Sequence, residues 1–136
     1  MTPLAETPAL YAGFGCRKGC PVETLHALLH STLHAYGLPL AAVQGIASLA
    51  LKADEPGLQC LAERLELPLV LFDAASVQPF AAQLSHHSPA AFAHSGCWGV
   101  AESTALALAQ RSHSQARLRV PRQVLGPATL ALAIGG

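Results

Sequence analysis

The chain has 136 residues, a length that suits one domain with one hydrophobic core. Hydrophobic residues make up 51% of it and charged residues 12%, a balance that excludes an intrinsically disordered protein. Eight basic residues match eight acidic ones, so the chain has no overall field to attract nucleic acid or an anionic membrane. Any anionic ligand must therefore meet a local cluster of charge.

The first half of the chain alternates between predicted strands and helices. Residues 9–15 form an apolar strand that runs into a glycine-rich turn, and apolar residues then recur at helical spacing from Pro21 to Tyr36. Gly37 and Pro39 end that helix. A second strand is predicted at 44–51, a second helix from a cap at Asp54 to Leu65, and a third strand at 69–72.

The second half predicts the remaining elements of an α/β domain. Helical turns run to Leu84 from Asp73 or Ser76, a loop follows at 85–89, and a helix occupies 100–110. Further strands are predicted at 90–94, 116–120 and 128–134, the last two separated by the segment 121–127. Alternation of strands and helices implies right-handed crossovers and a mostly parallel sheet, and the last two strands form an antiparallel pair. We expect one three-layer domain over residues 1–136, with helices on both faces of the sheet and residues 1–8 flexible.

Three turns between a strand and a helix are candidates for a ligand site: Gly13–Gly19, Lys52–Gly57 and Gly96–Glu102. Open parallel sheets bind ligands beyond the carboxyl ends of their strands, so all three should lie at one edge. Each turn brings helix N–H groups with partial positive charge. Basic residues in or beside the turns add full charges: Arg17, Lys18, Lys52, and Arg119 or Arg122. A polycarboxylated ligand suits such a cluster, because arginine pairs bidentately with carboxylates.

Each turn also fits a purely structural interpretation. The glycines follow neither the dinucleotide spacing nor the phosphate-loop spacing, and glycine after a strand is often only a turn residue. Asp54 and Glu102 equally fit residues that stabilise the start of a helix. Trp98 either stacks on a flat ligand or fills the core. Cys16, beside Arg17 and a helix start, is either a reactive thiolate or a small side chain packed under the turn.

Three histidines, His26, His30 and His34, repeat at one-turn spacing on the first predicted helix. Two of them could bind a transition metal, but no carboxylate stands at a matching step, so the sequence favours a solvated helix face. We expect neither a metal nor a cofactor. The start lacks a basic region followed by an apolar stretch, and no apolar run approaches roughly 20 residues, so we expect a cytoplasmic protein.

The three turns together resemble a known family. The runs that carry the resemblance are Gly13-x-Gly15-Cys16-Arg17-Lys18-Gly19, Lys52-Ala53-Asp54-Glu55-x-Gly57 and Val100-Ala101-Glu102, and the segment 121–133 is similar to the family's last hairpin. From about residue 10 to 135, these runs follow one another in the same order as in the CobE and CbiG C-terminal family of cobalamin biosynthesis, which the chain therefore resembles. Members often carry Ser or Thr at the positions of Cys20 and Gly99, and Lys at that of Arg122.

The resemblance implies an α/β domain that acts on corrin-ring intermediates, with other enzymes of that pathway as possible partners. A precorrin-type tetrapyrrole is the implied ligand. Its carboxylates would meet Arg17, Lys52 and Arg122, its ring would approach Gly15, Cys16, Trp98 and Gly99, and Asp54, Glu55 and Glu102 would orient the cations or handle protons. A CbiG-like hydrolase, which opens a precorrin lactone with loss of a two-carbon fragment, is the first alternative, with Glu102 or Glu55 as general base. An unrelated module that binds small anions is the second.

Overall fold

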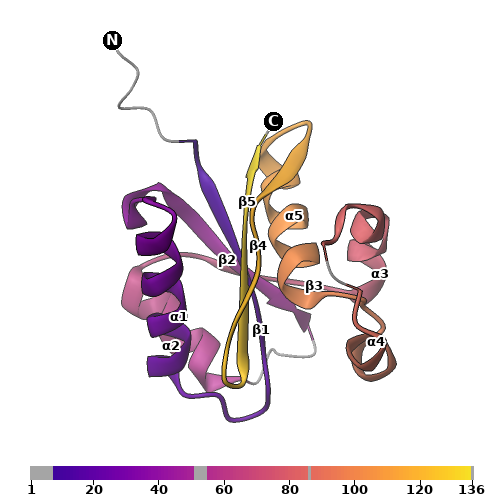
Figure 1. Cartoon of the computed structure of the whole chain (residues 1–136), viewed down its shortest axis with the longest axis horizontal. Coiled ribbons are helices and arrows are strands. Elements are labelled where there is room, and N and C mark those ends of the chain that lie inside the picture. The colour runs from indigo at the N-terminus through magenta and orange to yellow at the C-terminus, as the bar shows by residue number, and fades with distance from the viewer. Residues whose placement is uncertain (1–7, 51–54, 86, 136) are drawn as a thin grey trace.

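A five-stranded sheet forms the middle layer of the molecule (Figure 1). The computed structural model describes residues 8–50, 55–85 and 87–135, so seven of the eight residues predicted to be flexible lie outside it. The strands, in the spatial order β3-β2-β1-β5-β4, are β1 (Leu10–Cys16), β2 (Val43–Leu49), β3 (Leu69–Phe72), β4 (Ala116–Leu125) and β5 (Ala128–Gly135). The strands β1, β2 and β3 are parallel, while β5 runs antiparallel to both β1 and β4. The predicted α/β class with a C-terminal antiparallel pair is confirmed.

Helices cover both faces of the sheet, as Figure 1 shows. On one face lie α1 (Val22–Ala35) and α2 (Pro56–Leu65), and on the other α3 (Ala74–Val77), α4 (Pro89–Ser95) and α5 (Val100–Ser112). Two short 3₁₀ helices are η2 (Leu40–Ala42) and η4 (Gln78–Gln83). The helix α1 has 14 residues, and none of the helices in the described ranges has the length and apolar character to cross a bilayer.

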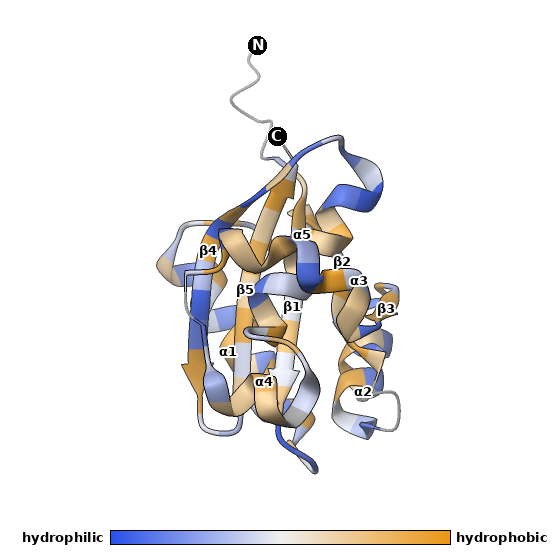
Figure 2. Ribbon diagram, turned by 90° about the vertical axis from the view of Figure 1, so that its right-hand side faces the viewer, coloured by the Kyte–Doolittle hydropathy of each residue, from blue (hydrophilic) through white to orange (hydrophobic). Residues whose placement is uncertain are grey.

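Two hydrophobic cores lie on the two sides of the sheet. Successive side chains of a strand point to opposite faces, so Phe14 packs against α1 and α2 while Tyr11 packs against α5. The interior strand β5 is hydrophobic over most of its length, whereas hydrophobic and hydrophilic residues alternate along the edge strand β4 (Figure 2). This pattern is the one expected when only one face of an edge strand is covered.

The helix α5 packs directly on the backbone of β1. A Cβ on Gly13 would overlap the carbonyl oxygen of Ala101 and would lie 2.5 Å from the amide nitrogen of Ala105. The neighbouring strand β5 presents two further small residues, Ala131 and Ala133, to the same core. Gly13 therefore allows a close approach that a side chain would prevent.

The strand predicted at 90–94 is wrong, because these residues belong to α4. The hydroxyl of Ser88 accepts a hydrogen bond from the amide of Ala91 at 3.1 Å, and Pro89 occupies the first turn. Gly96 then ends the helix in the left-handed conformation, with φ of 77°. These are the usual helix start and stop residues, and the apolar run between them was too short to separate helix from strand by periodicity.

The strand β4 is longer than predicted and continues through Pro121 to Leu125. Proline has no N–H group to donate, which makes it rare in central strands but acceptable at an edge. The strand β4 is such an edge, and its register with β5 shifts between Leu118 and Val120 and again between Val120 and Gln123. Tertiary position, which the local sequence does not show, thus decides the extent of this strand.

Candidate functional site

Several chain reversals meet at the carboxyl end of β1. The amide of Arg17 donates a hydrogen bond to the carbonyl of Pro127 at 3.0 Å, which joins the β1–α1 connection to the β4–β5 turn. The two lie side by side at the lower edge of Figure 1. The helix α5 begins over the same strand end, since Val100 Cβ lies 3.5 Å from the position of a Cβ on Gly15. We call this edge the rim and define it by residues 16–21, 55–57, 99–102 and 122–128.

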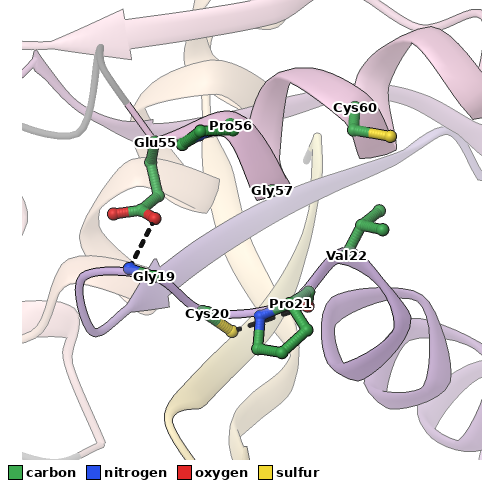
Figure 3. Close-up of a pocket in the computed structure, with 8 residues that line it drawn as sticks. All are labelled: Gly19, Cys20, Pro21, Val22, Glu55, Pro56, Gly57 and Cys60. Atoms are coloured by element: carbon green, nitrogen blue, oxygen red, sulfur yellow. Dashed lines mark hydrogen bonds between the residues drawn. The ribbon is translucent and has the colours of Figure 1, made fainter.

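Glu55 fixes the β1–α1 turn against α2. It is the N-cap residue of α2, its side chain is buried at 6% exposure, and its Oε2 accepts a hydrogen bond from the amide of Gly19 at 2.8 Å (Figure 3). Gly57 completes the contact, because a Cβ there would overlap the carbonyl oxygen of Cys20. The turn held in this way carries two exposed cations, Arg17 and Lys18.

A pocket of about 330 Å³ opens between this turn and the start of α2 (Figure 3). The turn contributes Gly19, Cys20, Pro21 and Val22, and α2 with its cap contributes Glu55, Pro56, Gly57 and Cys60. Its volume lies at the lower end of the range for small-molecule sites. The pocket suits part of a large ligand better than a whole macrocycle.

Glu102 holds a second part of the rim. It lies in the first turn of α5 with 1% of its side chain exposed, and its Oε2 accepts a hydrogen bond from the amide of Arg122 in β4 at 2.9 Å. Its Oε1 accepts from the amide of Ser85 at 2.9 Å, and the Ser85 hydroxyl donates to Oε2. One carboxylate thus joins α5, β4 and the segment between η4 and α4.

The cations of the rim have no acidic partner among the residues that the structure describes. Arg17, Lys18 and Arg122 form no ion pair there, and the buried Nε of Arg122 has no hydrogen-bond partner. Arg119 lies elsewhere, with its guanidinium 5.8 Å from the ring centroid of Tyr36 beyond the end of α1. Of the two arginines considered for the last turn, Arg122 is the one that lies beside Glu102.

The other predicted site residues are placed as follows. Gly15 is buried in β1, where its carbonyl accepts a hydrogen bond from the Thr129 hydroxyl at 3.3 Å. Cys16 is the last residue of β1 and is 8% exposed. Gly99 is the N-cap of α5 and provides no side-chain cap. Lys52 and Asp54 lie outside the described residues, so their predicted ligand roles stay predictions. The helix cap predicted at Asp54 is wrong, because α2 begins at Pro56 with Glu55 as its N-cap.

Trp98 packs at the edge of the core, which is one of its two predicted environments. Its ring stacks on Phe92 at 4.3 Å between centroids and 20° between planes, and it packs against the core on the α5 side. It remains partly exposed. Its stacking partner is thus a protein side chain, which covers one face of the indole.

Four residues that shape the rim have roles that the sequence did not predict: Gly19, Gly57, Ser85 and Thr129. Gly19 and Gly57 were predicted only as members of the turns, and Ser85 and Thr129 were not singled out. The glycine in the run Lys52-Ala-Asp-Glu-x-Gly57 was visible, but its role depends on the carbonyl of Cys20, which is far away in sequence. Ser85 gave no signal, because its partner Glu102 is 17 residues away.

Comparison with known proteins identifies the family. Residues 10–133 match the family model described as the C-terminus of cobalamin synthesis protein G. The chain belongs to this family of cobalamin biosynthesis proteins. The predicted resemblance is therefore confirmed.

Individual relatives agree with this assignment. Protein CobE of a Sinorhizobium species is 36% identical over 124 residues, which are 91% of this chain and 79% of that protein. A crystal structure of CobE has a TM-score of 0.89 at 41% identity and covers 93% of this chain and 90% of its own. The cobalt-precorrin-5A hydrolase of Salmonella typhimurium is 38% identical over 78 residues, which are 57% of this chain but only 21% of that enzyme.

Proposed function

We propose that the chain binds a precorrin-type tetrapyrrole at the rim. The observation that carries this proposal is that the acidic residues of the rim bond backbone amides and not the basic residues of the rim. Glu55 and Glu102 accept hydrogen bonds from the backbone amides of Gly19 and Arg122, whereas Arg17 and Arg122 have no acidic partner among the described residues. The acids hold the backbone and leave the cations available for the carboxylates of a ligand.

The spacing of the cations suits a ligand with carboxylates spread around a large ring. Leu125, Ala128 and Cys16 lie side by side across β4, β5 and β1. Arg122 precedes Leu125 by three residues and Arg17 follows Cys16, so their Cα atoms are four residues apart along the strands and two strands apart across them. At about 3.3 Å per residue and about 4.8 Å per strand, the separation is roughly 16 Å.

Exposed apolar side chains beside the cations suit the apolar ring of such a ligand. Val124 and Leu125, at the end of β4, are 58% and 42% exposed. They adjoin the β4–β5 turn, which the amide of Arg17 contacts through Pro127. A tetrapyrrole has an apolar ring within a border of carboxylates, and such a ligand would cover these side chains while it pairs with the arginines. The pocket beside Glu55 would take one of its side arms.

Hydrolysis is the second candidate function, because one relative is named a cobalt-precorrin-5A hydrolase. Glu55 or Glu102 would then act as the general base that activates water. Both carboxylates are buried and accept hydrogen bonds from backbone amides. This arrangement supports a positioning role for them, and it makes binding without turnover the function that the geometry supports best.

Titration of the purified protein with precorrin intermediates, followed by absorbance and mass spectrometry, tests both candidates. A binding protein returns the intermediate unchanged, whereas a hydrolase yields an opened lactone and acetaldehyde. We expect Arg17→Ala and Arg122→Ala each to weaken binding by roughly ten- to a hundredfold, because a charged hydrogen bond contributes about 1.5–3 kcal/mol. Lys52→Ala should act in the same direction.

Arg117→Ala is the matched control. It removes the same charge as the other two variants, and Arg117 lies in β4 as Arg122 does. Arg117 pairs with Ile134 of β5, which in turn pairs with Leu10 at the amino end of β1, away from the rim. Equal dissociation constants for Arg17→Ala, Arg122→Ala and Arg117→Ala would refute the proposed site. Failure of the wild-type chain to retain any tetrapyrrole would favour a small-anion ligand instead.

A further inference from the structure

Two histidine rings face each other on the exposed side of α1. His26 and His30 are four residues apart, and their ring centroids lie 4.5 Å apart with 54° between the ring planes. His30 is exposed and His26 is half-buried, so both rings can be reached from solvent. His34, one turn further on, is exposed but makes no ring contact with either of them among the described residues.

The separation of the two rings matches a metal chelate. An imidazole nitrogen binds a divalent transition metal at about 2.0–2.1 Å, which puts the ring centroid about 3.2 Å from the ion. Two rings at a right angle around the ion then have centroids about 4.5 Å apart, and at the tetrahedral angle about 5.2 Å. The observed centroid separation is compatible with the right-angle value, which is the geometry of octahedral and tetragonal ions.

We propose that His26 and His30 form a surface site for a divalent transition-metal ion of octahedral or tetragonal geometry, with Ni²⁺ and Cu²⁺ as the types that fit. No group of three or more metal-ligating side chains gathers in the described part of the chain. Water therefore completes the coordination sphere, and the ion exchanges with solvent. A site with two protein ligands differs in this respect from a closed structural zinc site.

Charged groups from two helices act on His26: Glu23 from α1 and Arg64 from α2. The pKa of His26 is lowered by partial burial first, and then by His30 and Arg64, against the opposing effect of Glu23. Arg64 is itself held by Glu23, with 3.5 Å between Nη2 and Oε2.

Equilibrium dialysis of the untagged full chain against Ni²⁺ tests the site. We expect His26→Ala and His30→Ala each to weaken Ni²⁺ binding at least about tenfold, because each removes one ring of the facing pair. His34→Ala is the matched control, since it removes a histidine from the same exposed stripe, and it should keep the wild-type dissociation constant. Circular dichroism of all three variants verifies that α1 is intact.

Two results would overturn the proposal. One is an unchanged Ni²⁺ dissociation constant in both His26→Ala and His30→Ala, which would place the ion at other histidines such as His87. The other is an equal loss in His34→Ala, which would mean that the ion binds the stripe without selecting this pair. The test is independent of tetrapyrrole binding, so either proposal can fail alone.

Discussion

Replacing Gly13 by alanine should destabilise the protein far more than replacing Gly15. Both glycines lie in β1, two residues apart on the side that faces α5. At Gly13 the new Cβ would lie 2.5 Å from the amide nitrogen of Ala105 and would also overlap the carbonyl of Ala101. Both atoms belong to the helix backbone, so no side-chain rotation relieves the overlap, and α5 must move away by roughly 1 Å. We expect a loss of about 3 kcal/mol or more in the free energy of unfolding.

At Gly15 the same substitution meets an atom that can move. The nearest atom to the new Cβ is Thr129 Oγ1 at 2.6 Å, followed by Val100 Cβ at 3.5 Å. Rotation of Thr129 would relieve the overlap and would give up its hydrogen bond to the Gly15 carbonyl. Such a bond contributes about 0.5–1.5 kcal/mol, so we expect Gly15→Ala to cost about 1 kcal/mol.

Urea unfolding measures both values, with Trp98 fluorescence and far-UV circular dichroism as probes. Trp98 lies two residues before α5 and so reports on the element that must move. Equal free energies of unfolding for the two variants would refute the reasoning, because they would show that α5 yields as easily as the Thr129 side chain.

Two further predictions concern the rim and the histidine pair. Glu55→Gln should lower the free energy of unfolding by about 1 kcal/mol, because a neutral acceptor replaces a charged one opposite the Gly19 amide, and urea unfolding should show no such loss for Glu63→Gln on the exposed side of α2. The lowered pKa of His26 means that the unfolded chain binds this proton more readily, so its protonation reduces stability as the pH falls below about 6.5. NMR titration should place the His26 pKa below that value and show an upward shift in Arg64→Gln, and a downward shift there would contradict the assigned cause.

Elements with strong local signals could be predicted from the sequence. The helix α1 has apolar residues at helical spacing and ends at a glycine, and it was placed within about one residue at each end. The strands β1, β3 and β5 are apolar runs between turn residues, and they too were found. The two errors, α4 read as a strand and β4 ended early at Pro121, occur where a short segment takes its structure from its neighbours.

The candidate site could be predicted only in outline. Convergence of the turns after β1 and β2 follows from topology, since parallel strands present their carboxyl ends at one edge. The third turn, 96–102, follows the helix α4 and not a strand, so this rule does not explain its position. The tasks of individual residues depend on contacts between distant positions, such as Glu55 with Gly19 at 36 residues and Glu102 with Arg122 at 20 residues. The local sequence carries no information about such pairs, so it cannot distinguish a carboxylate that bonds a backbone amide from a candidate general base.

A carboxylate that bonds a backbone amide fixes the position of a rim residue, whichever side chain that residue carries. Glu102 holds the amide of Arg122, which every residue except proline possesses, so Arg122→Lys should leave the free energy of unfolding within about 0.5 kcal/mol of wild type. The ligand would nevertheless lose a planar, bidentate partner and meet a single ammonium group. We therefore expect tetrapyrrole affinity to fall while stability stays, with urea unfolding and absorbance titration as the paired measurements. A parallel loss of both would show that the Arg122 side chain, and not only its amide, supports the fold.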